Sequence, residues 1–134
     1  MVKKLATQPR QVAVVEDDGG VREAIQNLLS SANHPSRSFG TVEGFLRSKN
    51  IRRFGCLIVD AQLSGMSGIA LHEHLLSRGI AIPTIIITAD EERGRRLRAR
   101  GSSQNLVAVL AKPFDGEEFL RAVRSALNLT TSKR

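Results

Sequence analysis

Four continuous apolar runs, spaced along the chain, restrict its fold more than any other feature. They are QVAVV (11–15), CLIVD (56–60), TIIIT (84–88) and LVAVL (106–110). A strand with one face in water alternates apolar and polar residues, whereas a strand buried on both faces is apolar almost throughout. The runs are also short and rich in β-branched residues, which favours strands over buried helices. They therefore predict a parallel sheet that is covered on both faces.

Segments with helical periodicity separate these runs. Apolar residues recur at helical spacing in 21–32, 71–76 and 119–127. A weaker strand is expected near residues 36–39, followed by Thr41 as the N-cap of a short helix. The segment 91–100 contains Gly94 and has little to bury apart from Leu97, so it is a poor helix. Five strand–helix units joined by right-handed crossovers predict a doubly wound α/β sandwich.

The length and composition suit one globular domain. With 134 residues the chain can bury its own core, and we expect residues 11–128 to form it, between an N-terminal extension (1–10) and a C-terminal tail (129–134). No apolar run could span a membrane, so no membrane partner is expected, and the basic N-terminus lacks the apolar segment of a signal peptide. The single cysteine, Cys56, begins an apolar run, which predicts a buried, inert thiol and a cytoplasmic location.

The net charge of +7 raises the question of nucleic-acid binding. Half of the residues in 91–100 are Arg, but the chain has no Trp or Tyr that could stack on bases. A solvated basic helix face is the favoured interpretation of this segment. Contact with DNA or with an acidic partner is an alternative that the sequence does not favour.

Polar residues stand where the apolar runs end. Acidic residues 16–18 follow the first run, Asp60 ends the second, Thr88 ends the third, and Lys112 comes just after the fourth. In doubly wound sheets, ligands bind at the carboxyl ends of the strands. Clustered carboxylates suit a hard cation such as Mg²⁺, and a lysine with a threonine hydroxyl suits phosphoryl oxygens. The residues at the strand ends therefore predict a site in which clustered acids bind a cation, and a lysine and a threonine contact a phosphoryl group.

Four segments together resemble a known family. VAVVEDDGGVREAI, LIVDAQLSGMSG, TIIITAD and VLAKPF are similar to the signature blocks of the receiver domain of two-component response regulators, in the same order along residues 11–128. The resemblance implies a flavodoxin-like strand order of 2-1-3-4-5. It also implies that Asp60 accepts a phosphoryl group from a sensor histidine kinase or a histidine phosphotransfer protein.

The resemblance assigns a role to each remaining strand-end residue. Mg²⁺ would be bound by Glu16, Asp17, Asp60 and the backbone carbonyl of Gln62. Thr88 and Lys112 would contact the phosphoryl oxygens, and the Lys112–Pro113 peptide bond would be cis. Such a protein is a phosphoacceptor rather than an enzyme, although it assists its own phosphorylation and dephosphorylation.

Three features depart from the family pattern. Leu63-Ser64 stands where Met-Pro is usual, and Val109 stands where an aromatic residue often takes part in switching. The third is an insertion, SSQN (102–105), before the last strand. All the expected site residues are present, so we expect the chain to be phosphorylated. The surface that changes on phosphorylation is expected to differ from that of the family.

Several alternatives stay open. The chain could be the receiver half of a longer DNA-binding transcription regulator or a non-phosphorylated interaction module, and a homodimer is also open. An aspartyl-phosphate hydrolase of the haloacid dehalogenase type is disfavoured, because those enzymes need D-x-D and this chain has Asp60-Ala61-Gln62.

Overall fold

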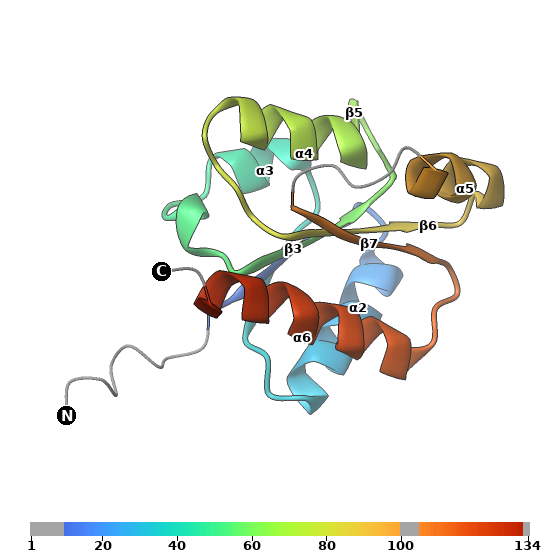
Figure 1. Ribbon diagram of the computed structural model, residues 1–134, viewed down its shortest axis with the longest axis horizontal. Helices are drawn as coiled ribbons and strands as arrows, with labels where there is room; N and C mark the ends of the chain where they lie inside the picture. The colour runs from blue at the N-terminus through green and yellow to red at the C-terminus, as the bar shows by residue number, and fades with distance from the viewer. Residues whose placement is uncertain (1–9, 100–104, 133–134) are drawn as a thin grey trace.

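The computed structural model describes residues 10–99 and 105–132, which fold around a parallel sheet (Figure 1). Within these residues the sheet has five strands, in the order β2, β1, β3, β6 and β7. Their bounds are Ser36–Phe39 (β2), Val12–Val15 (β1), Cys56–Asp60 (β3), Thr84–Thr88 (β6) and Leu106–Ala111 (β7). The doubly wound sheet and its strand order, both predicted from the sequence, are confirmed.

Helices cover both faces of the sheet, as Figure 1 shows. On one face lie α3 (Val42–Leu46), α4 (Gly68–Ser77) and α5 (Glu91–Ala99), and on the other lie α2 (Gly19–Ser31) and α6 (Gly116–Ser132). Successive residues of a strand point to opposite faces, so Val12 and Val14 join one hydrophobic cluster while Ala13 and Val15 join the other. Both clusters need apolar side chains from the same strands, which is why the runs are continuous. None of the helices among the described residues is long and apolar enough to span a membrane.

Side-chain caps fix where several helices begin. Asp18 accepts hydrogen bonds from the backbone N–H groups of Gly20 and Val21 at the start of α2. Thr41 caps α3 as predicted, and Asp115 accepts from the Glu118 N–H at the start of α6. Each cap satisfies backbone donors that have no partner inside the helix.

Some local features differ from the sequence expectations. A short antiparallel hairpin, β4 (Gln62–Leu63) and β5 (Met66–Ser67), follows β3, and a 3₁₀ turn, η1 (Ile51–Arg53), precedes it. Helix α6 continues to Ser132, so most of the predicted tail 129–134 is helical, because no Gly or Pro follows Gly116 to end the helix. The predicted extension 1–10 lies outside the described residues except for Arg10, and so does the insertion 102–105 except for Asn105.

The segment expected to be a poor helix forms α5, and Gly94 has a packing role within it. Gly94 is buried, and a Cβ atom at this position would lie 3.2 Å from Cγ2 of Thr88. The glycine therefore lets α5 approach the end of β6 closely, although it weakens the helix itself. Leu97, only 7% exposed, is the apolar anchor of α5 in the core.

The burial of Cys56 gives a simple test of the fold. The side chain is fully buried, and burial raises the pKa of the thiol far above its usual value. We expect no reaction with a disulfide reagent at pH 8 in the folded protein and complete reaction in concentrated guanidinium chloride, since only the thiolate reacts. Rapid labelling of the folded chain, measured by absorbance or intact mass, would contradict this placement of β3.

Candidate functional site

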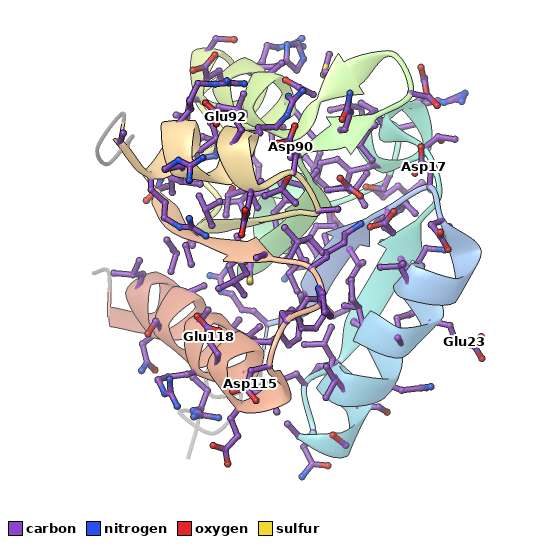
Figure 2. All side chains as sticks on the ribbon, turned by 90° about the vertical axis from the view of Figure 1, so that its right-hand side faces the viewer. Asp17, Glu23, Asp90, Glu92, Asp115 and Glu118 are labelled. Carbon is purple, nitrogen blue, oxygen red and sulfur yellow. The ribbon has the colours of Figure 1, made fainter. Side chains whose placement is uncertain are left out.

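The carboxyl ends of four neighbouring strands meet at one edge of the sheet. Strand register places Val15 beside Val59, Asp60 beside Ile87 and Thr88 beside Ala111. The residues that end or follow these strands are therefore neighbours in space. Figure 2 views this edge from outside, with Asp17 and Asp90 labelled on different strand ends.

Lys112 forms the central contact of the site. Its Nζ atom donates to Oδ2 of Asp60 at 2.7 Å and to Oε1 of Glu16 at 3.3 Å. The Lys112 side chain is 21% exposed, whereas those of Asp60 and Glu16 are 12% and 1% exposed. One cation just after β7 thus bridges the carboxylate that ends β3 and the carboxylate that directly follows β1. The peptide bond that follows it, Lys112–Pro113, is cis as predicted.

Backbone N–H groups hold the other oxygens of the two carboxylates. Gln62 donates its N–H to Oδ1 of Asp60 at 2.9 Å, and Asp18 donates its N–H to Oε2 of Glu16 at 3.1 Å. Gln62 begins β4, just after β3, and Asp18 lies in the connection between β1 and α2. Each carboxylate is therefore oriented by its own loop and joined to the other through Lys112.

The proximity of the acids shifts the ionisation of the site. Burial, followed by the negative charge of Asp60, raises the pKa of Glu16 above its usual value, although the Asp18 N–H and Lys112 oppose this rise. Burial by itself would lower the pKa of Lys112, but its contacts with Asp60 and Glu16 outweigh burial and raise that pKa. The site therefore favours a cation beside its carboxylates.

Thr88 faces the same cavity as Asp60 from the adjacent strand. The cavity has a volume of about 440 Å³ and is lined by Asp60, Gln62, Thr88, Ala89, Asp90 and Lys112. The Thr88 hydroxyl oxygen accepts the backbone N–H of Asp90 at 3.0 Å and lies 3.4 Å from the Asp90 carbonyl. Thr88 is thus in the site, but its hydroxyl is engaged by its own loop.

Asp17 lies at the rim. It is exposed, and the Ser64 hydroxyl donates to its Oδ2 at 3.5 Å. Among the described residues, no three His, Cys, Asp or Glu side chains are grouped as a metal site, and Lys112 contacts both Asp60 and Glu16. The donor chemistry nevertheless suits Mg²⁺, because two nearby carboxylates compete for one lysine and a third, that of Asp17, directly follows Glu16 in the chain. The ligand set of Glu16, Asp17, Asp60 and the Gln62 carbonyl stays a prediction.

Two arginines near the site were not anticipated from the sequence. Arg22 of α2 donates to the backbone carbonyl of Glu16 at 2.7 Å, which ties the helix to the end of β1. Arg98 of α5 donates from Nε and Nη2 to the carbonyl of Val109, at 3.3 and 3.1 Å. Neither contact has a sequence signal beyond an arginine on a helix near a strand end.

Comparisons with known proteins agree with this geometry. Residues 12–124 match the response regulator receiver domain family, and the chain belongs to that family. The response regulator protein TodT of Pseudomonas putida is 29% identical over 133 residues, which are 99% of this chain and 58% of TodT. The transcriptional regulatory protein TdiR of Thauera aromatica is 31% identical over 120 residues, which are 88% of this chain and 51% of TdiR. The chain therefore spans little more than half the length of these relatives.

Solved structures show the same fold. The response regulator StyR has a TM-score of 0.81 with 35% identity, covering 91% of this chain and 61% of StyR. A signal receiver domain from an HD domain-containing protein of Pseudomonas fluorescens also has a TM-score of 0.81, with 94% of this chain and all of that domain covered. At 23% identity, this second likeness concerns the fold alone.

Removing Lys112 should expose the repulsion between Asp60 and Glu16. In Lys112→Met the two carboxylates lose their shared cation, so the pKa of Glu16 should rise further. An acid with a raised folded-state pKa costs stability as pH rises above its unfolded value of 4.5. We expect urea unfolding to show a deficit of about 1–3 kcal/mol at pH 8, less than for a fully buried pair, and a smaller deficit at pH 5. Lys49→Met, at an exposed position, is the control; an equal deficit at both pH values would contradict this assignment.

Proposed function

We propose that this chain is a Mg²⁺-dependent phosphoacceptor in which Asp60 receives a phosphoryl group from a phosphohistidine. Receiver domains pair with histidine kinases, so the donor would be a sensor histidine kinase or a histidine phosphotransfer protein. The observation that supports the proposal most directly is the 2.7 Å contact between Lys112 and Asp60 at the wall of an open cavity. A carboxylate that already contacts a cation, and that a ligand can reach from solvent, has what an anionic phosphoryl group requires.

The transfer itself asks little covalent chemistry of the protein. An oxygen of Asp60 would form the new bond to phosphorus while the phosphorus–nitrogen bond to the donor histidine breaks, and the imidazole leaves with that electron pair. Lys112, which contacts the Asp60 carboxylate, would also contact the phosphoryl oxygens and neutralise part of their negative charge. The Gln62 N–H would keep the Asp60 side chain in place. The Thr88 hydroxyl, once released by the Asp90 backbone, would donate to a phosphoryl oxygen.

The acidic residues supply a site for the metal. Receiver domains generally bind Mg²⁺ at the phosphorylation site, and here Glu16, Asp17, Asp60 and the Gln62 carbonyl would hold it. When bound, Mg²⁺ would neutralise the incoming phosphoryl oxygens and bring them toward Asp60. The raised pKa of Glu16 supports this assignment, because a cation would relieve the repulsion that causes part of the shift.

The output would be a change in partner binding in two-component signalling within the cytoplasm. The chain would act as a phosphoacceptor rather than an enzyme with a separate substrate. The chain spans about half the length of the transcriptional regulatory protein TdiR. The second candidate function is therefore that of a receiver domain in a longer regulator that carries a DNA-binding output domain. A non-phosphorylated interaction module is the third, favoured only by the net charge of +7 and by Val109, whose half-buried side chain packs against the core.

Phosphorylation of Asp60 can be tested with a small phosphodonor. With acetyl phosphate and Mg²⁺, intact mass should increase by one phosphoryl group that hydroxylamine removes, and Asp60→Asn should abolish the increase. Asp90→Asn is the matched control, because Asp90 lines the same cavity and asparagine can still cap α5. Full labelling of Asp60→Asn would place the acceptor elsewhere, and an unlabelled wild type would favour the interaction module.

The metal assignment depends on Asp17. Asp17→Asn should weaken Mg²⁺ binding about tenfold, because an anionic oxygen is replaced by a neutral amide. Asp18→Asn should leave binding nearly unchanged, since Asp18 caps α2 and asparagine caps equally well. Titrations of backbone amide shifts by NMR would measure both. Equal affinities for the two variants would contradict the ligand set.

A further inference from the structure

Charge is unevenly distributed along the strand direction of this molecule. Ten of the 13 acidic residues follow the carboxyl ends of strands, at the edge that Figure 2 views. They are Glu16, Asp17, Asp18, Asp60, Asp90, Glu91, Glu92, Asp115, Glu117 and Glu118. The other three lie within α2, α3 and α4. No Asp or Glu lies in the connections that precede β1, β2, β3 and β6.

Basic side chains occupy that opposite, acid-free end. We define the basic pole as the six exposed residues Arg10, Arg47, Lys49, Arg52, Arg53 and Arg78. Hydrogen bonds tie its connections together: Arg52 donates to the carbonyls of Gly79 and Arg78, and Arg10 donates to the carbonyl of Arg53. In Figure 1 the connections before β1, β3 and β6 lie on the same side of the molecule. The pole is therefore one surface drawn from three connections.

The positive charges of the pole have no acidic partners among the described residues. In residues 10–99 and 105–132, the side chains of the pole form no ion pair, whereas Arg95 and Arg96 of α5 both pair with Glu92. Part of the pole lies at helix C-termini, where a cation is favoured: Arg47 and Arg78 are the C-cap residues of α3 and α4. A helix end does not neutralise a full positive charge, so these exposed side chains stay available to an anionic partner.

We infer that the basic pole binds the phosphate backbone of a nucleic-acid duplex. The core of a protein interface is usually apolar, and basic clusters that bind membranes usually lie beside a membrane-spanning helix or on an amphipathic one. The pole itself is entirely basic, and Leu129, 47% exposed, is the one exposed large apolar side chain of the described residues. Single strands need exposed aromatic rings for stacking, and the described phenylalanines are buried or half-buried. Arginines and lysines without apolar or aromatic company match a regular array of phosphates, with contacts that carry no base specificity.

The experiment compares two triple variants of equal net charge. Lys49→Gln/Arg53→Gln/Arg78→Gln removes three charges from the pole, and Arg95→Gln/Arg96→Gln/Arg121→Gln removes three elsewhere, so each lowers the net charge from +7 to +4. The pole triple spares Arg10 and Arg52, whose side chains hold the connections together. Binding of a fluorescent DNA duplex of arbitrary sequence is followed by anisotropy in rising NaCl, without Mg²⁺ or phosphodonor.

The wild type should bind the duplex at low salt, with log K falling linearly against log salt. In the pole triple, affinity at the lowest salt should fall about tenfold or more, and the slope should shrink by about 0.9 for each lost phosphate contact. The control triple should bind within about threefold of the wild type. Matched thermal unfolding curves would show that all three proteins are folded.

Three results would overturn the inference. The first is an equal loss in both triples, which would make net charge alone responsible. The second is no binding by the wild type at low salt. The third is salt-reversible self-association without DNA binding, in sedimentation experiments, which would mean that the pole docks on the acidic edge of a second copy. Phosphorylation plays no part in the assay, so failure of the acceptor assignment would leave this result unaffected.

Discussion

The repulsion between two carboxylates governs the organisation of this molecule at its functional end. A parallel sheet aligns the carboxyl ends of its strands, so the residues that follow β1 and β3 are forced into proximity. Glu16 and Asp60 are both nearly buried there, and Lys112, which directly follows β7, contacts both. Since an unpaired buried charge is costly, the loops after all three strands are arranged around this contact. The proposed metal binding would also depend on the need of these two carboxylates for a nearby positive charge.

The sheet and most of this site could be predicted because both follow from periodicity. Strands buried on two faces leave continuous apolar runs, and the polar residue that ends each run marks the functional edge. The hairpin β4–β5 escaped prediction, because strands of two residues are too short for any period. Side-chain rotation is not encoded locally either. The sequence places Thr88 at the site, but it does not indicate that the hydroxyl turns to the backbone of Asp90.

Buried polar contacts between segments that are separated in the sequence could not be predicted from it either. The structure places the Nδ1 atom of His72 2.9 Å from Oγ1 of Thr84. The Thr84 hydroxyl donates to the carbonyl of Ile82, so His72 donates from Nδ1. Residues twelve positions apart meet here only because α4 packs against β6. Helix spacing can exclude a shared metal for His72 and His74, but it cannot find this partner.

The contact between Arg98 and Val109 bears on how the edge of the sheet is protected from pairing with another chain. The backbone N–H of Lys112 donates to the carbonyl of Thr88, so the backbone groups of Lys112 point toward β6. Successive residues direct their backbone N–H and C=O groups to opposite sides in the plane of the sheet. The carbonyl of Val109, three residues earlier, therefore points away from β6, to the open edge of the sheet. An unpaired strand edge is a template on which another chain can add a strand. The guanidinium of Arg98 already occupies one of the outward acceptors that such an added strand would need. The edge strand of this sheet is therefore partly sealed against intermolecular pairing by a side chain from its own neighbouring helix.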